Sequence, residues 1–335
     1  KVPFPAPCGF IVAMSRPDLT SKLTAALRSA LFLSGSVLLL TLPGIGAPKP
    51  ANRVAITTEG DYRFIRSNGW PDHEPGAFPR KGNPNALAEI ERTFRIPLHP
   101  VPAKEVTPTR HAFFGVALNG VPFEPGTAEF WKNDPSSGWH YEAKTGFLDL
   151  GLDEHNAHVQ PDGSYHYHGL PVGHLEKRGG DGASMRQIGW AADGFPIYTA
   201  RGPRDANDAS SPLIRLRSSW QIKKGARPAA DSGPGGEYDG RFTEDFEFVP
   251  GSGELDEANG RQGVTPEFPQ GTYYYCVTAE FPSLGRFWRG TGDPSFQKGP
   301  PGGPGGPGRP GGPRRPGFGP PPGGRPPGGP PPRPQ

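Results

Sequence analysis

Apolar residues in this chain occur in short runs that glycine, proline and polar residues interrupt. Two examples are the runs 112–118 and 271–277, and long apolar patterns with a period of 3.6 residues are missing. Short runs bounded by turn residues are typical of β-strands joined by loops. The pattern therefore predicts a mainly β fold with long loops, in one compound domain over residues 48–298. The one segment that favours a helix is short and isolated, Asn85 to Phe94.

One alternating segment carries most of the candidate chemistry. Residues 152–175 hold five of the nine histidines, and Tyr165, His166, Tyr167 and His168 follow a Pro-Asp-Gly sequence at 161–163. Tyrosine favours strands, and a strand points residues i and i+2 to the same face. We therefore expect both imidazoles on one face and both phenols on the other. Such a strand presents two ligands to one metal ion.

Two stretches of the chain resemble each other in the same order. Residues 115–123 match 189–197, with a hairpin signal in each at Asn119-Gly120 and Asp193-Gly194. Residues 152–156 match 255–259, and a tyrosine-rich segment follows each, 165–168 or 273–276. These matches predict two pseudo-repeated β units, about 112–171 and 186–282, although chance similarity of short glycine-rich strings is the alternative.

The second unit lacks the histidines of the first. Where the first unit has His158, His166 and His168, the second has Arg261, Tyr274 and Cys276, while the other tyrosine positions persist. The tyrosine face is therefore expected to be structural and to pack in the core. The histidine face differs between the units, as functional groups on a shared scaffold do.

The N-terminal segment has the pattern of a secretory signal peptide. A basic stretch follows Met14, an apolar run covers 29–42, and small residues close the segment at Gly46-Ala47. The run is short for a membrane span, which needs about 20 apolar residues. We expect residues 1–13 to be an upstream artefact and 14–47 to be removed, leaving a secreted or extracytoplasmic protein without a stable membrane span. An uncleaved anchor is the alternative.

The C-terminal segment changes the meaning of the overall charge. Residues 299–335 are nearly all glycine, proline and arginine, a composition typical of a disordered tail. Of the net charge of +3, about +3 falls on residues 1–47 and about +6 on 298–335, which leaves about −6 for 48–297. An acidic domain is a poor nucleic-acid binder. The arginine-rich tail can contact anionic cell-surface polymers or remain solvated.

Cysteine usage excludes an intrachain disulfide in the expected mature protein. Cys8 lies before Met14, so that only Cys276 remains after processing. A lone cysteine in a secreted protein is a buried thiol, a metal ligand or an intermolecular partner. The sequence leaves these three roles open.

The chain resembles the YHYH-domain family, named for the tetrapeptide that stands here at 165–168. The resemblance also includes Asn156 to Pro161, Gly163 to Pro171, Ser67 to His73, Gly82 to Asn85 and Asp193 to Tyr198, within residues 54–290. The resemblance implies no particular activity.

The histidines differ in how well the pattern supports them as ligands. His166 and His168 are the first candidates. His158 lies on the segment that leads into the turn at 161–163, so that the returning chain can bring it to the same site. His73 follows Pro71-Asp72 in a loop and can be a fourth ligand. Three or four imidazoles favour a borderline ion, Zn²⁺ or Cu²⁺ before Fe²⁺ or Ni²⁺, and disfavour Ca²⁺ and Mg²⁺. Weaker candidates, which ordinary surface roles also explain, are His155, His174 and His140. Candidate carboxylates that orient imidazoles are Asp153, Glu154 and Asp162.

Three classes of function are compatible with these residues. The first is a secreted protein that binds a transition metal through the histidine cluster. The second is a metalloenzyme, a hydrolase or oxidoreductase, with an open histidine-ligated site. The third is a cell-envelope structural or partner-binding β module without metal. The sequence contains no HExxH, GxSxG or Walker motif that names a reaction.

Overall fold

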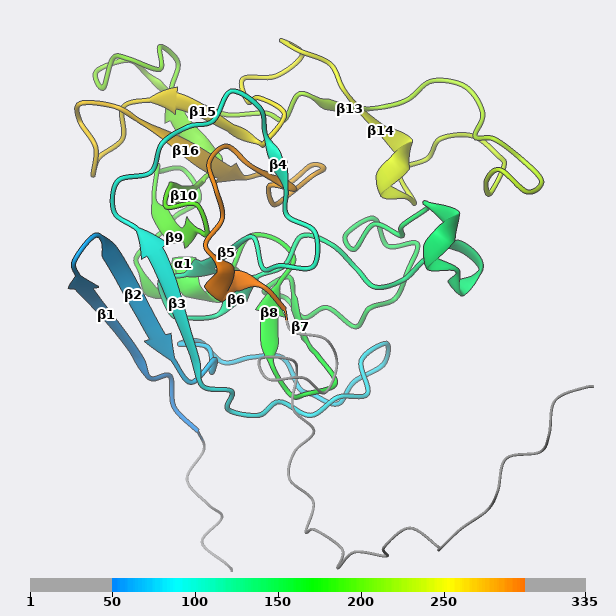
Figure 1. Cartoon of the computed structure of the whole chain (residues 1–335), viewed down its shortest axis with the longest axis horizontal. Helices are drawn as coiled ribbons and strands as arrows, with labels where there is room; N and C mark the ends of the chain where they lie inside the picture. Colours follow the sequence, from blue (N-terminus) through cyan, green and yellow to red (C-terminus); the bar gives the residue numbers. More distant parts are fainter. Residues whose placement is uncertain (1–49, 299–335) are drawn as a thin grey trace, which may run out of the picture. The chain divides into compact units, whose positions relative to one another are not determined.

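The computed structural model describes residues 50–298, and this part of the chain is mainly β, as the sequence predicts (Figure 1). Its strands are short, between two and six residues, and long loops join them. The predicted signal peptide, the upstream segment before it and the glycine- and proline-rich tail lie outside these residues. Within residues 50–298 no helix is long and apolar enough to cross a membrane.

Eight of the strands form one mixed sheet, in the order β15-β16-β10-β9-β5-β6-β8-β7. They are β5 (Gly115–Ala117), β6 (Pro122–Phe123), β7 (Ala157–Val159), β8 (Tyr165–Tyr167), β9 (Gln187–Ala191), β10 (Pro196–Thr199), β15 (Gly260–Gly263) and β16 (Thr272–Val277). The order divides into two halves that meet at the antiparallel pair β5·β9.

The two halves have the same internal arrangement. In the first, β7 pairs antiparallel with β8, β8 parallel with β6, and β6 antiparallel with β5. In the second, the corresponding pairs are β15·β16, β16·β10 and β10·β9, with the same three directions. The predicted repeats, about 112–171 and 186–282, contain the strands of these halves. Duplication as the origin of the halves stays a prediction.

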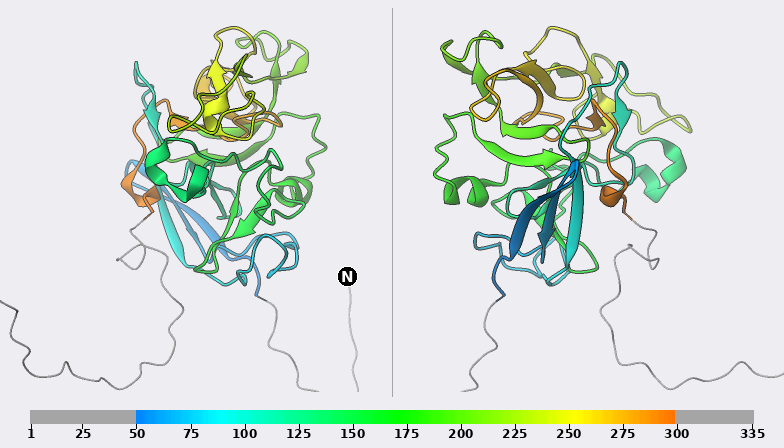
Figure 2. Two further views of the ribbon diagram at one scale, coloured as in Figure 1. Left: turned by 90° about the vertical axis from the view of Figure 1, so that its right-hand side faces the viewer. Right: turned by 60° about the vertical axis from the view of Figure 1, so that its left-hand side comes forward.

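A second sheet packs against the large one. Its three antiparallel strands lie in the order β1 (Val54–Glu59), β2 (Tyr62–Ser67) and β3 (Arg92–Pro97), and Figure 2 shows them as a separate blue-to-cyan layer. The inner faces of β2 and β3 place Ile65, Phe94 and Ile96 in the same apolar core as Val116 and Ile197 of the large sheet. Because alternate strand residues share a face, these short strands can bury one side while the other stays exposed.

The remaining elements are small and lie in the long connections. Three two-stranded ladders are formed by β4 (Thr107–Pro108) with β17 (Phe287–Trp288), β11 (Arg201–Pro203) with β12 (Leu213–Arg215), and β13 (Trp220–Ile222) with β14 (Phe246–Phe248). The helical elements are α1 (Val172–Lys177) and the 3-10 turns η1 (Trp131–Asn133), η2 (Pro135–Ser137), η3 (Thr243–Asp245) and η4 (Pro294–Phe296).

The helix expected over Asn85 to Phe94 is wrong. Its first part is an extended loop, and its last residues belong to β3. The backbone N–H of Ala88 donates to Gly163 and that of Ile90 donates to Asn68, over 2.9 and 2.8 Å. These amides therefore bond to distant segments in place of the preceding helical turn. Tertiary pairing has overridden a weak local helix propensity.

Candidate metal centre

The hairpin of β7 and β8 is held by the turn between its strands. Gly163 adopts a φ of +92°, a conformation that side chains disfavour, and a Cβ there would lie 2.6 Å from that of Ala88. Asp162 Oδ1 accepts hydrogen bonds from the backbone N–H and hydroxyl of Ser164, over 2.9 and 2.7 Å. Glycine and aspartate at these positions fix the register of the strands that follow.

This register brings three imidazoles to one face of the hairpin. His158 on β7 lies directly opposite His166 on β8, and His168 follows two residues later on the same face. The N–H of His168 donates to the carbonyl of Asn156 over 2.7 Å, which extends the ladder beyond β8. The opposite face carries Tyr165 and Tyr167, both buried in the apolar core. The predicted separation of imidazoles and phenols is confirmed.

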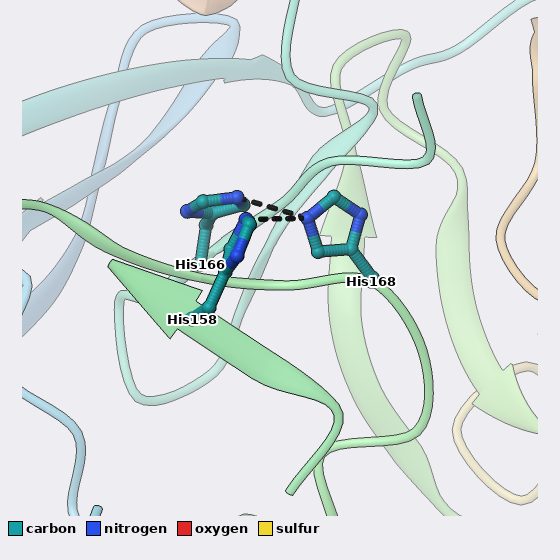
Figure 3. Close-up of side chains that lie close together, drawn as sticks. All are labelled: His158, His166 and His168. Carbon is teal, nitrogen blue, oxygen red and sulfur yellow. Dashed lines mark hydrogen bonds between the residues drawn. The ribbon is translucent and has the colours of Figure 1, made fainter. Parts of the chain in front are cut away.

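The three rings converge through their Nε2 atoms, as Figure 3 shows. His168 Nε2 lies 3.0 Å from His166 Nε2 and 3.1 Å from His158 Nε2. Nitrogen ligands 2.0–2.1 Å from a tetrahedral zinc ion are about 3.3–3.4 Å apart, close to these two separations. One ring nitrogen from each of the three histidines lies within 4.8 Å of the others, so that the group could hold one metal ion, and we call these three residues the histidine triad.

The hydrogen bonds of the rings favour lone pairs that face inward. His158 Nδ1 donates to the carbonyl of Leu150 over 2.8 Å, so its neutral ring carries no proton on Nε2. His168 Nε2 faces the Nε2 atoms of both His166 and His158, and a single proton on it can be donated to only one of them. Its Nδ1 is buried without a hydrogen-bond partner among residues 50–298. A cation between the rings accepts all three lone pairs, which a proton cannot do.

Burial keeps two of these rings neutral. It lowers the pKa of His166 and His168 well below the usual value, and the neighbouring imidazoles act in the same direction. At His168 the nearby cations Arg286, Lys298 and Lys144 lower the pKa further. Neutral imidazole is the form that binds metal ions, so both rings are in the ligating state at neutral pH.

A pocket of about 310 Å³ opens beside the triad, and all three histidines line it. Glu124 also lines it, directly after β6, with its Oε2 3.7 Å from His166 Nε2. The backbone N–H of Glu124 donates to the backbone carbonyl of Tyr167 over 2.9 Å. Gln160 Nε2 donates to Glu124 Oε2 over 2.5 Å, and Lys298 forms an ion pair with Glu124 Oε1. Glu124 is thus a held carboxylate beside the triad, and the sequence reasoning missed it.

The structure places His73 apart from the triad. Its Nε2 is hydrogen-bonded to the Tyr167 hydroxyl at 2.7 Å, on the tyrosine face, and its ring lies 4.0 Å from that of His155. His155 donates from Nε2 to the carbonyl of Glu74 and accepts at Nδ1 from Gly173. Burial lowers the pKa of His73. The only group of three or more possible ligands found within residues 50–298 is the triad.

The weaker candidates have other partners. His174 Nδ1 lies 2.8 Å from Asp72 Oδ2, and His140 Nδ1 lies 3.0 Å from Glu244 Oε1. Asp153 accepts the Tyr165 hydroxyl at 2.5 Å on the tyrosine face, while Asp162 holds the turn. Glu154 lies 3.7 Å from His155 Nε2. The candidate site is therefore reduced to the three rings of the triad and Glu124.

Cys276 on β16 is buried and free, which matches the first of the three roles that the sequence left open. Burial raises the pKa of its thiol to about 12. A thiol that holds its proton this firmly is a poor nucleophile and a poor metal ligand.

Comparison with known proteins identifies a family and no closer relative. The family model described as YHYH protein matches residues 93–290. This range contains the triad, Glu124 and both halves of the large sheet, while the similar segments at 67–73 and 82–85 precede it. No curated protein and no solved structure matches the chain.

Proposed function

We propose that this chain, which belongs to the YHYH protein family, binds one transition metal ion, Zn²⁺ or Cu²⁺, through His158, His166 and His168. The observation that carries the proposal is the convergence of three Nε2 atoms, two of them on buried rings, on one point. Three imidazoles suit borderline ions, among which copper has the higher affinity for nitrogen and zinc is common in tetrahedral sites.

Metal content tests this proposal directly. The full chain, purified without a polyhistidine tag and without chelator, should carry about one equivalent of zinc or copper by plasma mass spectrometry. The double variant H166A/H168A should carry none. H140A is the matched control, because His140 is partly exposed and pairs with Glu244 away from the triad. It should retain the full equivalent.

Two results contradict metal binding. One is a wild-type protein that remains metal-free after incubation with zinc and copper. The other is an H166A/H168A variant that retains as much metal as the wild type. The first result favours the third class of function, a structural or partner-binding module of the cell envelope. Circular dichroism of the double variant distinguishes loss of the ligands from loss of the fold.

The pocket beside the triad favours a second candidate, a metalloenzyme. Three protein ligands leave a coordination position free for water or substrate, as in catalytic zinc sites. Here the triad faces about 310 Å³ of space, and Glu124 stands at its edge with Lys298 and Gln160 fixing its orientation. A carboxylate in this place can accept a proton from a bound water or orient a substrate.

Glu124 separates the two candidates. If the protein is a metal-dependent hydrolase, E124Q should still bind one equivalent of metal. Its rate of hydrolysis of activated esters should fall at least about 100-fold, the lower end of the rate enhancement that a general base provides. D162N is a poor control because Asp162 holds the turn, whereas E129Q changes another carboxylate of the pocket wall and should leave the rate unchanged. No metal-dependent hydrolysis in the wild type, or equal rates in E124Q, removes the hydrolase candidate.

The location of the protein is part of the same proposal. The signal-peptide pattern at 14–47 supports export, and the basic segment 299–335 supports contact with anionic cell-surface polymers. N-terminal sequencing of the exported protein should find a start near residue 48. If the protein stays inside the cell with residues 14–47 intact, export is contradicted. If truncation after Lys298 leaves the binding of an anionic polymer unchanged, the role of the tail is contradicted.

A further inference from the structure

A second pocket, of about 380 Å³, shares no lining residue with the one beside the triad. Its wall combines Arg63 of β2, the loop that follows β3, and Trp190 of β9. Leu98, Val101 and Phe268 make much of the remaining wall apolar. Val101 is 77% exposed, so this side of the pocket is accessible in the described part of the chain.

The charge of this pocket is opposite to that of the domain around it. Arg63 and His99 line it, and no aspartate or glutamate does. Residues 48–297 carry about −6 in total, so a wall without carboxylates is unusual here. A concave surface with an arginine and no acidic group attracts anions.

Arg63 is placed as an anion receptor. Its guanidinium lies over the ring of Trp190, 3.6 Å from the ring centroid, and the side chain is partly buried. Contact with the ring restricts the guanidinium, and none of the described residues accepts a hydrogen bond from it, so its N–H groups can pair with a planar, two-oxygen partner. Burial lowers the pKa of Arg63, and no carboxylate opposes this effect.

Other arginines in the described residues show what Arg63 lacks. Arg66, on the same strand, stacks on Phe64 and pairs with Glu59 at 3.1 Å. The partly buried Arg92 and the buried Arg227 also have carboxylate partners, Asp162 and Asp245. The guanidinium of Arg63 has neither an ion pair nor a hydrogen bond to any residue in 50–298. No described residue therefore neutralises the guanidinium of Arg63, which leaves it able to pair with an anion that comes from outside the domain.

We propose that this pocket binds a carboxylate carried on a short apolar group. The two carboxylate oxygens pair with the guanidinium of Arg63, and the apolar part contacts Leu98, Val101 and Phe268. A free aliphatic acid and the C-terminus of a peptide both have this chemistry. The site is independent of the triad, so that it stands whether or not the protein binds metal.

Hexanoate and its neutral analogue hexanamide test the proposal on the full-length protein. Isothermal titration should show saturable binding of sodium hexanoate, and hexanamide should bind at least about tenfold more weakly, since a charged hydrogen bond is lost. In NMR spectra, hexanoate should shift the indole signal of Trp190, which W190F identifies among the six tryptophans. Equal affinities for acid and amide overturn the role of the charge, and no saturable binding of any probe overturns the site.

Variants of the two stacked arginines on β2 provide the matched comparison. R63Q should weaken hexanoate binding at least about tenfold, whereas R66Q should change it less than about twofold, because Arg66 already has a carboxylate partner. R63K keeps the charge without the planar fork and should fall between them. Unchanged binding in R63Q overturns the proposal, and melting temperatures of all variants reveal any loss of fold.

Two peptides distinguish the sources of the carboxylate. A tripeptide that ends in leucine with a free C-terminus should compete with hexanoate, and the C-terminally amidated peptide should not, if peptide ends are the ligand. If only hexanoate binds, the pocket recognises free aliphatic acids. Competition by both peptides alike means that the carboxylate is not recognised and counts against the proposal.

Discussion

The β7–β8 and β15–β16 hairpins occupy corresponding places at the two ends of the large sheet, and of these described strands only the first pair carries a group of possible metal ligands on one face. In the first, His158 lies opposite His166, and the face borders a pocket. In the second, Arg261 lies opposite Tyr274, and Arg261 Nε donates to the Tyr274 hydroxyl over 2.6 Å. The same strand geometry therefore carries a group of possible metal ligands at one end and a closed polar contact at the other.

On the opposite face, both hairpins have two tyrosines, the first of which contacts an aspartate. Tyr165 donates to Asp153 in the first and Tyr273 donates to Asp256 in the second, over 2.5 and 3.0 Å. Each aspartate also accepts backbone hydrogen bonds from the segment that enters the hairpin. The histidines thus lie on the face opposite to these tyrosine–aspartate contacts, so the histidine face can change while the contacts stay.

The residues that face the two hairpins from the neighbouring strands differ as well. Glu124, after β6, stands beside His166, whereas Tyr198 of β10 lies 5.5 Å from the Tyr274 ring. Tyr198, Tyr274 and Cys276 belong to a small buried core with Leu216. The second hairpin therefore packs its variable face, while the first leaves that face polar and open to a pocket.

Exchange of the variable residues should produce the largest effect. The triple variant H158R/H166Y/H168C gives the first hairpin the residues of the second. We expect it to bind none of the proposed metal, because no imidazole of the triad remains and one thiol alone holds zinc poorly. The pocket of about 310 Å³ offers space for the larger side chains. Plasma mass spectrometry and circular dichroism report metal and fold.

Each outcome of this exchange has a distinct meaning. The expected one, a folded triple variant without metal, means that the residues of the two faces are interchangeable on this hairpin. An unfolded variant means that the triad, or the water around it, is required by the fold of this half. Metal retained by the folded variant contradicts the triad as the binding site.

The features predicted from sequence are those that depend on local periodicity. Alternation from 165 to 168 and the turn at 161–163 are enough to place His166 and His168 together, because a strand repeats every two residues. His158 was predicted to lie at the same site because the chain returns antiparallel after the turn. Burial of the tyrosine face followed from its persistence in both units, and the structure confirms it.

What the sequence left out depends on contacts between distant segments. Glu124 reaches the triad because β6 pairs parallel with β8, Phe123 opposite Tyr167, and no periodicity specifies that pairing. His73 was expected to join the ligands, but the path of its loop brings it to the hydroxyl of Tyr167. The helix expected before Phe94 failed for the same reason, since its amides bond to remote carbonyls.

The shared tyrosine–aspartate contacts should differ in strength. Y165F removes a hydrogen bond between two buried groups, and should lower the free energy of unfolding by about 1.5–3 kcal/mol. Y273F should cost less, about 0.5–1.5 kcal/mol, because Asp256 is partly exposed and keeps its contact with Arg289. Urea unfolding of both variants measures the difference. Equal losses contradict the comparison, since they mean that burial of the aspartate has no influence.

The triad should make the metal-free protein sensitive to acid. The pKa of His166 and His168 lies below the usual 6.5 in the folded state, so the unfolded chain takes up protons first as the pH falls. Stability should therefore decrease below about pH 6.5, by up to about 1.4 kcal/mol per pH unit for each group. H166Q/H168Q should flatten this slope in urea unfolding from pH 7 to 5. Parallel curves would falsify the assignment of neutral buried rings.

The second hairpin should contribute the smallest effect, at the opposite end of the pH scale. Burial raises the pKa of the Cys276 thiol from 9.0 to about 12, so the folded protein keeps a proton that the unfolded chain loses. Stability should then fall as the pH rises above 9, and C276A should reduce this slope. Between pH 9 and 10 the thiol acts before Tyr274, whose pKa is raised from 10.0 to about 12. Y274F is therefore the control that leaves this interval unchanged. If C276A and wild type lose stability in parallel there, the thiol is accessible to base, and the closed packing of this face is contradicted.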